Sequence, residues 1–465
     1  MSGLYSSLNS AVMALNAHSR ALETSGKNLA NVNNAAYARQ RIVYGDRGTV
    51  VTPDGAESLG MEALGVQQMR DALLDRQLMR ESSHSASFSA EQGGYQRAQA
   101  ALGQSVNRAA AASGTGAGGL AAALDEFFNA FHSLAVRPTD AGERQSLLQK
   151  AAILTDRLQL TDQRLAQVQA DLEAQVADDV RDVNRLLGTI AELNAQIGRF
   201  EINAPGSAVD LRDQRQAKLE ELAAKLPVEL RDQSGGQVQV VAKDPAGAAV
   251  VLVDRTQVTD PVAFDGTQLT AGATALAPGA GAIMGALTAR DGAVQALRHD
   301  LDQLARQLVT SVNAAYNPTG ATGDFFAPTA TSAGAIALAG TLNAASLKAS
   351  DGGPAGDNTV ALAVAQLGAR TFATAAGDAI DGTFSGFFSQ TVSKLGQALA
   401  GANARVDDQA NIEKLVRAQR DAVSGVSLDE EMADLMKYQR AFQASSRVFQ
   451  TIDDLLDVVV NRLGR

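Results

Sequence analysis

The chain has 465 residues, so it is too long for one compact core and predicts about two to four domains. Aromatic residues make up only 4% of the sequence and Trp is absent, which favours long helices packed along narrow contacts. The net charge of −11, without a concentrated basic run, excludes binding to a nucleic-acid backbone. The absence of Cys excludes disulfides, thiolate nucleophiles and thiolate metal sites.

The first predicted helix starts at Ser2 and ends near Asn33-Asn34, a pair that favours a turn. Large apolar residues recur in it every seven positions, at Leu8, Leu15, Leu22 and Leu29. A seven-residue step returns each side chain to nearly the same face of a helix, so the stripe predicts a coiled-coil contact. The second apolar position of the repeat is weak, being occupied by Ala11, His18 and Ser25. This helix therefore needs a partner.

An extended connector is expected from Tyr37 to about Leu59, with a short β-prone patch at Ile42 to Tyr44. Helical periodicity resumes around Val66 and continues to about Ala112. Residues Ser113 to Gly119 then break the helix. Although this break is rich in Gly, it has no preceding strand and no following Gly-Lys-Ser, so it does not predict a phosphate-binding loop.

A much longer helix begins at Asp140 and Glu143, which form a D-x-x-E start signal. Apolar residues follow at steps of three and four over most of its length. They are Leu147, Leu154, Leu158, Leu165, Val168, Leu172, Val176, Val183, Leu187, Ile190 and Ile197. A pattern sustained this far predicts a coiled-coil helix. A turn at Asn203 to Ser207 and a helix from Leu211 to Leu226 follow.

The apolar period changes to two between Pro227 and Pro278, which predicts a small inserted β-domain that closes on itself. Helices are expected again from Ile283 to Tyr316 and from Phe384 to Val423, with an irregular stretch between them. Because these helices must pack with the earlier ones, the helical domain is discontinuous in sequence.

The C-terminal helix begins with the capping box Ser427-Leu428-Asp429-Glu430, in which the Ser427 hydroxyl and the Glu430 carboxylate each bond the other residue's N–H. We interpret these acids as local helix stabilisers. The helix carries a second seven-residue stripe at Leu428, Leu435, Phe442, Phe449, Leu456 and Leu463. Pairing the two terminal helices leaves their other faces for neighbouring molecules. This arrangement indicates assembly rather than catalysis.

These patterns predict a mainly α fold with paired terminal coiled-coil helices, an elongated discontinuous α-helical coiled-coil domain and one small inserted β-domain. The expected divisions are 1–60 for the N-terminal helix and connector, 61–226 and 288–424 for the two parts of the helical domain, 227–287 for the β-insert, and 425–465 for the C-terminal helix.

No pattern predicts an enzyme, a metal site or a cofactor site. The four His residues lie on different segments, without the spacing of metal ligands, and no nucleophile and base occur in a recognisable arrangement. The first residues carry neither a basic nor an apolar signal-peptide region, and no apolar run is long enough to cross a bilayer. We therefore expect neither a cleaved signal peptide nor membrane insertion.

The sequence resembles the bacterial flagellar axial proteins, the rod, hook and hook-associated group, at both ends. Residues Ser25 to Gln40 are similar to the N-terminal signature of that family, and Val426 to Ser445 to its C-terminal motif. The N-terminal motif residues are Asn28, Leu29, Ala30, Asn31, Asn33, Tyr37, Arg39 and Gln40. Ala36 replaces the Gly usual in this signature.

Two further segments narrow the resemblance. Leu211-Arg212-Asp213-Gln214-Arg215 and Gly356-Asp357-Asn358-Thr359 resemble the hook-associated protein 1 family more than hook or rod proteins. The resemblance implies a structural protein of the hook–filament junction, which polymerises through its terminal helices into a helical array with itself. The implied partners are hook protein, the next hook-associated protein toward the filament and a cytoplasmic export chaperone on the C-terminal helix.

The resemblance also implies an extracellular, flagellar location, reached through the flagellar type III apparatus. Three alternatives remain open from the residues. The chain is another flagellar axial protein, of the hook or distal rod; a secreted enzyme on a coiled-coil scaffold; or a cytoplasmic coiled-coil adaptor.

Overall fold

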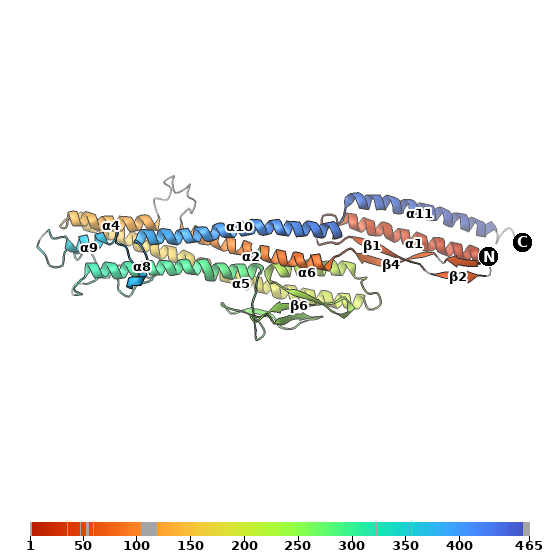
Figure 1. Ribbon diagram of the computed structural model, residues 1–465, viewed down its shortest axis with the longest axis horizontal. Coiled ribbons are helices and arrows are strands. Elements are labelled where there is room, and N and C mark those ends of the chain that lie inside the picture. Colours follow the sequence, from red (N-terminus) through yellow and green to blue (C-terminus); the bar gives the residue numbers. More distant parts are fainter. Residues whose placement is uncertain are drawn as a thin grey trace. The chain divides into compact units, whose positions relative to one another are not determined.

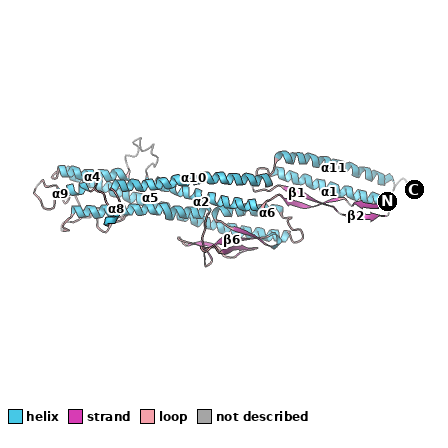
Figure 2. Ribbon diagram, viewed as in Figure 1, coloured by secondary structure: helices cyan, strands magenta, loops and turns pink. Residues whose placement is uncertain are grey.

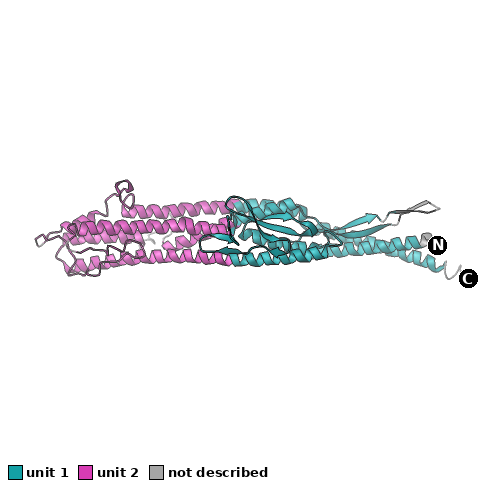
Figure 3. Ribbon diagram, turned by 90° about the horizontal axis from the view of Figure 1, so that it is seen from below, with its two compact units in different colours: residues 1–85, 180–281, 409–465 teal, residues 86–179, 282–408 magenta. Residues whose placement is uncertain are grey.

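The computed structural model describes residues 2–34, 36–46, 48–52, 55–58, 60–103, 119–320, 323–354 and 356–458. The predicted break at 113–119 falls outside these residues except for Gly119, and Leu463 also falls outside them. The chain forms two compact units, each built from separated segments (Figure 3). Unit 1 comprises Met1–Ser85, Val180–Gly281 and Gln409–Arg465, and unit 2 comprises Ala86–Asp179 and Ala282–Asp408.

Helices dominate the fold, as the sequence predicts (Figure 2). The α-helices are α1 Ser2–Ala30, α2 Ala72–Leu102, α4 Leu120–Val136, α5 Ala141–Phe200, α6 Val209–Lys225, α7 Gly281–Ala289, α8 Gln295–Tyr316, α9 Thr359–Gln366, α10 Phe384–Ser424 and α11 Leu428–Asp457. A π-helical segment, Arg290–Val294, joins α7 to α8, and short 3-10 turns lie at Ser234–Gly236 and Thr374–Ala376. Helices α1 and α11, named here the terminal helix pair, lie side by side in unit 1 (Figure 1).

The segment after α1 is a β-hairpin, which is longer than the predicted β-prone patch and corrects the predicted start of the next helix. Strand β1 Gln40–Asp46 pairs antiparallel with β4 Met61–Gln68, and the short strands β2 Thr49–Thr52 and β3 Gly55–Ser58 pair with each other. The β-prone patch expected at Ile42 to Tyr44 lies within β1, whereas the helix expected to restart near Val66 is wrong at its start, because Val66 lies in β4. The long-range ladder between β1 and β4 outweighs the local helical periodicity, which Gly65 already weakens.

Helix α2 begins only at Ala72, where a side chain provides the cap. The Asp71 carboxylate accepts hydrogen bonds from the N–H groups of Leu73 at 2.8 Å and Leu74 at 3.3 Å. These bonds satisfy donors that have no partner within the first helical turn. The start of the helix is thus set by Asp71 and by the end of the hairpin.

Helix α5 confirms the predicted long amphipathic pattern. Asp140 caps it, since its Oδ1 accepts from the N–H groups of Gly142 at 2.7 Å and Glu143 at 3.3 Å. All eleven apolar positions predicted between Leu147 and Ile197 are buried. The step of three and four residues therefore identified the contact face of this helix correctly.

Unit 2 has an aromatic core beside α4. Phe127 is fully buried, and its ring lies 5.2 Å from that of Phe131, 5.7 Å from Phe325 and 5.8 Å from Phe326, measured between centroids. Aromatic pairs at these separations stabilise beyond their buried area. The core therefore joins α4 to the irregular segment after α8.

The β-insert lies within unit 1 as two small antiparallel sheets. The first contains β5 Glu229–Asp232, β6 Val238–Lys243, β7 Ala249–Asp254 and β8 Gln257–Val258, and the second contains β9 Val262–Phe264, β10 Leu269–Ala271 and β11 Thr274–Leu276. The insert also contacts α5 beyond its two ends. Asn194 of α5 donates to the carbonyls of Val238 at 2.8 Å and Arg255 at 2.6 Å, and so ties the insert to the helix.

Candidate assembly site

The large apolar stripe of α1 lies beside the most buried face of that helix. Leu8, Leu15, Leu22 and Leu29 are each half-buried. The buried positions are small or polar: Ala11, Ala17, Ala21, Thr24, Ser25 and Asn28. Small side chains allow α11 and the β1–β4 hairpin, both packed on α1, to approach its backbone closely. Ala11 and Ser25, two of the three positions that weaken the predicted heptad, are therefore among the buried residues of α1.

The stripe of α11 is covered only in part within the chain. Leu456 is buried, and Leu435 and Phe449 are half-buried. In contrast, Leu428 is 51% exposed and Phe442 is 36% exposed. The terminal helix pair thus keeps large apolar side chains in contact with solvent.

The N-terminal motif forms a buried polar site around Asn28. The Asn28 side chain accepts from the N–H of Gln40 at 3.0 Å and donates to the carbonyl of Gln40 at 2.9 Å. It also accepts from the Tyr37 hydroxyl at 2.8 Å and donates to Glu431 Oε2 of α11 at 3.1 Å. Asn28 therefore joins the end of α1, the following loop and the start of α11.

Arg39 makes the strongest link between the two terminal motifs. Its Nε donates to Glu431 Oε1 at 2.6 Å, its Nη1 to Glu430, and its Nη2 lies 3.6 Å from Asp434. Burial alone lowers the pKa of Arg39, but the bonds to the two glutamates outweigh it and raise that pKa. The Arg39 and Glu431 side chains are 9% and 2% exposed, so both charged groups are shielded from solvent. Loss of one member of such a buried pair is strongly destabilising.

This geometry corrects the interpretation of the capping box. Ser427 does accept from the N–H of Glu430, at 3.5 Å, as predicted. The Glu430 carboxylate, however, binds Arg39, and no bond from it to the Ser427 N–H is found. The acids at the start of α11 therefore connect two ends of the chain as well as stabilising a helix.

The remaining motif residues support this site. Tyr37 keeps its proton because burial, together with Asp213, Asp210 and Glu431, raises its pKa well above the ordinary value. Gln40 reaches Asp210 of α6 at 2.9 Å. The other positions are peripheral: Asn31 bonds the Lys27 carbonyl, Leu29 is half-buried, and Ala30 and Asn33 are exposed.

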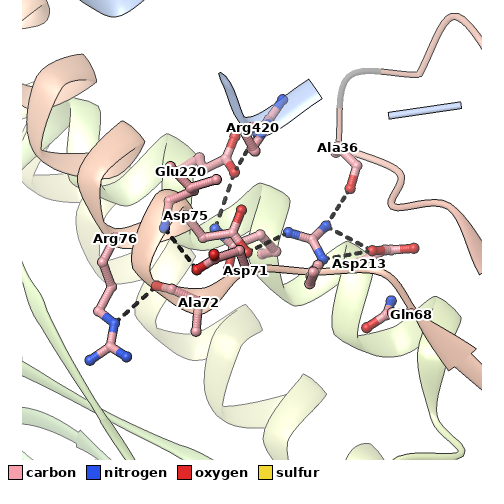
Figure 4. A network of polar contacts seen from close by, with 12 residues as sticks. Ala36, Gln68, Asp71, Ala72, Asp75, Arg76, Asp213, Glu220 and Arg420 are labelled. Atoms are coloured by element: carbon pink, nitrogen blue, oxygen red, sulfur yellow. Dashed lines mark hydrogen bonds and ion pairs between the residues drawn. The ribbon is translucent and has the colours of Figure 1, made fainter. Parts of the chain in front are cut away.

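A second polar cluster, centred on Arg70, ties the site to α2 and α6 (Figure 4). The Arg70 guanidinium donates to Asp213 at 2.7 Å, to Asp75 at 3.0 Å and to the Ala36 carbonyl at 2.7 Å. Burial raises the pKa of Asp213 above the ordinary value even though Arg70 lowers it. Ala36, which replaces the usual Gly of the signature, is thus fixed through its backbone.

Sequence reasoning missed most of this connection. Asp213 lies in the segment Leu211 to Arg215 noted for its resemblance, and Glu431 lies beside the capping box, but neither was assigned a partner. No signal identified Arg70, because its bonds to the Ala36 carbonyl and to Asp213 join residues far apart in the sequence. A polar cavity of 350 Å³ lies between the loop after α1 and the start of α11, lined in part by Asn31, Tyr37 and Glu430.

The chemistry of this site is hydrogen bonding and ion pairing. Within the described residues, no group of three or more His, Cys, Asp or Glu side chains is placed to hold a metal ion. Among the helices of the described ranges, none combines the length and apolar character required to span a bilayer.

Two family profiles match the chain. Residues 106–326 match the family described as "Flagellar hook-associated protein FlgK helical domain". Residues 418–463 match "Flagellar basal body rod FlgEFG protein C-terminal". The first range contains all of α5 and the β-insert, and the second contains α11 with the acids that bind Arg39.

Curated relatives match over nearly their whole length. The chain is 24% identical to flagellar hook-associated protein 1 of Bacillus subtilis, over 100% of this chain and 99% of that protein. It is 23% identical to the Escherichia coli protein of the same name, over 98% and 99%. A solved structure, the flagellar hook junction protein FlgK from Burkholderia pseudomallei, shares the fold with a TM-score of 0.62 and 14% identity, covering 75% of this chain and all of that one. Together these similarities place the chain in the flagellar hook-associated protein 1 family, whose members are structural proteins of the bacterial flagellum.

Proposed function

We propose that the chain is a structural subunit of the junction between flagellar hook and filament, and that its terminal helix pair makes the contacts between subunits. The family supports the location, since relatives along the whole chain are named hook-associated protein 1. The observation that supports the role of the helix pair is the partial exposure of its large apolar residues, notably Leu428 and Phe442. Exposed apolar surface of this kind marks an interaction site.

The contacts are heterologous, because α1 and α11 present different faces to a neighbour. Heterologous contacts that do not close into a ring propagate as an open helical array. The polar site of Asn28 and Arg39 holds the two helices in one orientation, so that every copy presents the same surface. The proposed role of the chain is mechanical, and we assign it no catalytic activity.

We assign hook protein and the next hook-associated protein as the axial neighbours. An export chaperone covers α11 before assembly, since an apolar stripe of this kind is an aggregation hazard in a cytoplasm. The chain then reaches the cell exterior through the flagellar type III apparatus. Capture assays with the purified chain test each of these partners.

The direct test is complementation of a strain that lacks this chain, with electron microscopy of filament attachment. We expect hooks without filaments in the deletion strain, and attached filaments once the chain is restored. Normal filament attachment in the deletion strain would contradict the proposed function.

The test of the helix pair uses Phe442→Glu, with Phe442→Leu as the matched control. Because Phe442 is 36% exposed in the single chain, a charge there leaves folding largely intact but opposes burial against a neighbour. We expect the Glu variant to be exported without supporting filaments, and the Leu variant to support them. Filament attachment at the wild-type level in the Glu variant would assign subunit contacts to another surface.

A further inference from the structure

A groove runs between α2 and the strand β5 within unit 1. Three neighbouring cavities form it, with volumes of 130, 260 and 290 Å³. Arg76, Met79 and Leu230 line both the first and the second cavity, and Arg80 and Val228 line both the second and the third. The shared residues make the cavities one continuous space, named here the α2–β5 groove.

The β5 wall of this groove is a free strand edge. Strand β5 is the first of its sheet and pairs only with β6. The Gln233 N–H donates to the Gln237 carbonyl at 2.9 Å and so sets the alternation of the ladder. Because every second residue of an antiparallel strand bonds its partner strand, Leu230 and Asp232 turn their N–H and C=O groups outward. Within the described residues, no other group bonds the outward backbone of Leu230, and such an edge is a template for a further strand.

The α2 wall of the groove is basic. Arg76, Arg80 and His84 follow one another at steps of four residues, and all three are exposed and line the groove. Arg76 donates to the Ala72 carbonyl at 3.0 Å (Figure 4). In the part of the chain that the structure describes, neither Arg76 nor Arg80 forms an ion pair. These two guanidinium groups favour a ligand that carries carboxylates.

The acids on the β5 wall already have basic neighbours. Glu229 forms an ion pair with Lys243 at 2.6 Å. Asp232 lies close enough to Arg212 and Arg215 to favour their charged forms. The two arginines of the α2 wall therefore remain available for carboxylates that a ligand supplies.

The spacing of the basic side chains matches that of an extended chain. Four residues of a helix advance about 6 Å along its axis. Two residues of a strand advance about 6.6 Å, and their side chains lie on the same face. The cavities place Arg76 toward the Asp232 end of β5 and Arg80 toward the Val228 end, so helix and strand run side by side. Carboxylates at alternate positions of an added strand are therefore in step with the two arginines.

We propose that the α2–β5 groove binds an extended segment of a partner protein, which adds to β5 as a further strand and carries carboxylates at alternate positions. The backbone of that segment bonds the outward N–H and C=O groups of Leu230, and its carboxylates pair with Arg76 and Arg80. The site uses no residue of the terminal helix pair, and it is additional to the proposed function.

The test measures binding of a fluorescein-labelled six-residue peptide, with Val and Glu in alternation, to the purified full-length chain by fluorescence anisotropy. The β-branched Val residues favour an extended backbone. A peptide of the same composition, with three Val followed by three Glu, is the control for spacing, and a peptide with Val and Lys in alternation is the control for charge. We expect the alternating Glu peptide to bind, the block peptide to bind more weakly and the Lys peptide not to bind.

Variants of the chain separate the strand edge from the basic wall. Leu230→Pro removes an N–H that faces outward, so the ladder with β6 is retained while the added strand loses a bond. Leu230→Ala keeps this N–H and is the matched control, and circular dichroism checks that both variants are folded. The double variant Arg76→Gln and Arg80→Gln should weaken peptide binding by roughly two- to thirtyfold, the range expected for the loss of two exposed ion pairs.

Hydrogen exchange of the full-length chain reports strand addition directly, and the N–H groups of Leu230 and Asp232 should exchange more slowly when the alternating Glu peptide is bound. Absence of binding by this peptide would overturn the inference. Equal binding of the block peptide, or undiminished binding to the Leu230→Pro chain, would indicate attraction of charge without strand addition and would overturn it too. Phe442→Glu, which tests the terminal helix pair, should leave peptide binding unchanged, so this inference and the proposed function fail by different results.

Discussion

Helix α5 and the terminal helix pair carry the same kind of apolar periodicity, yet their apolar residues are buried to different extents within the chain. Every predicted contact residue of α5, from Leu147 to Ile197, is buried within the chain. On α11, by contrast, Leu428 and Phe442 stay exposed to solvent. Periodicity therefore indicates that a helix needs a partner, but it does not indicate whether the partner lies in the same chain.

The aromatic core of unit 2 and the terminal helix pair also differ in the kind of interaction that stabilises them. The core beside α4 is apolar and aromatic, with Phe127 and Phe131 fully buried. The terminal helix pair is fixed at one end by charged and amide groups, chiefly Arg39 and Asn28. These contacts, called here the polar lock, set the orientation of the two helices without requiring a large apolar core. Such an arrangement suits helices that complete their burial against a neighbour.

Truncation of the aromatic core should have the largest effect on stability. Phe127→Ala removes a fully buried ring that contacts four others, so the free energy of unfolding of unit 2 should fall by roughly 3 to 5 kcal/mol. Phe442→Ala, at the half-exposed stripe of α11, is the control and should change stability much less. Urea unfolding followed by circular dichroism compares them. Equal losses in the two variants would remove the contrast between the regions.

Breaking the polar lock should act locally. Arg39→Met leaves Glu431 buried without its partner, and removal of one member of a buried ion pair costs roughly 3 to 5 kcal/mol. We expect faster hydrogen exchange in the first turns of α11, with α5 unaffected. Arg39→Lys keeps the charge but loses the forked geometry and should lie between wild type and Met. No change in exchange after Arg39→Met would show that the lock is dispensable.

Two adjacent glycines of α2 offer a matched pair in unit 2. A Cβ on Gly94 would lie 2.4 Å from the Cβ of Ala289, whereas a Cβ on Gly93 would meet nothing within 4 Å. Gly94→Ala should therefore destabilise by roughly 1 to 3 kcal/mol, because a fixed neighbour must move. Gly93→Ala should stabilise by roughly 0.5 to 1 kcal/mol, through the preference of Ala for helix. Thermal unfolding measures whether each substitution raises or lowers stability. A change in the same direction for both variants would contradict this packing.

The cap of α5 should have the smallest effect. Asp140→Ala removes the acceptor for the N–H groups of Gly142 and Glu143 and should cost about 1 kcal/mol. Asp140→Asn retains an acceptor oxygen and should be nearly neutral. If urea unfolding gives the two variants the same loss, the cap contributes through charge rather than through hydrogen bonding.

Local sequence signals predicted the elements of this fold well where the contacts are local. The Asp140 start signal and the apolar steps of α5 required only neighbouring residues to be read. The β1–β4 hairpin, the Arg70 cluster and the bonds of Asn194 to the β-insert escaped prediction. Each joins residues far apart in the chain, and a single sequence carries no periodic trace of such a pairing.

The candidate site was predicted in part. The N-terminal motif named Asn28 and Arg39, which bond Glu431 of α11. It also named Tyr37, which bonds Asn28, and Gln40, which bonds Asp210 of α6. Their partners were not assigned, because Glu430 and Glu431 have a sufficient local explanation at a helix start. Their position at a helix start accounts for these two glutamates, so the sequence provided no reason to expect a second role in binding Arg39.

Hydrogen exchange of the purified monomer, compared with the assembled chain, tests the central claim that the terminal helix pair completes its burial against neighbours. In the monomer we expect α5 to be strongly protected from Leu147 to Ile197. Exchange should be fast in α1 and α11, except near Asn28 and Glu431, where the polar lock holds. On assembly both helices should gain protection along their length. Protection of α1 and α11 equal to that of α5 in dilute monomer, unchanged on assembly, would contradict the account.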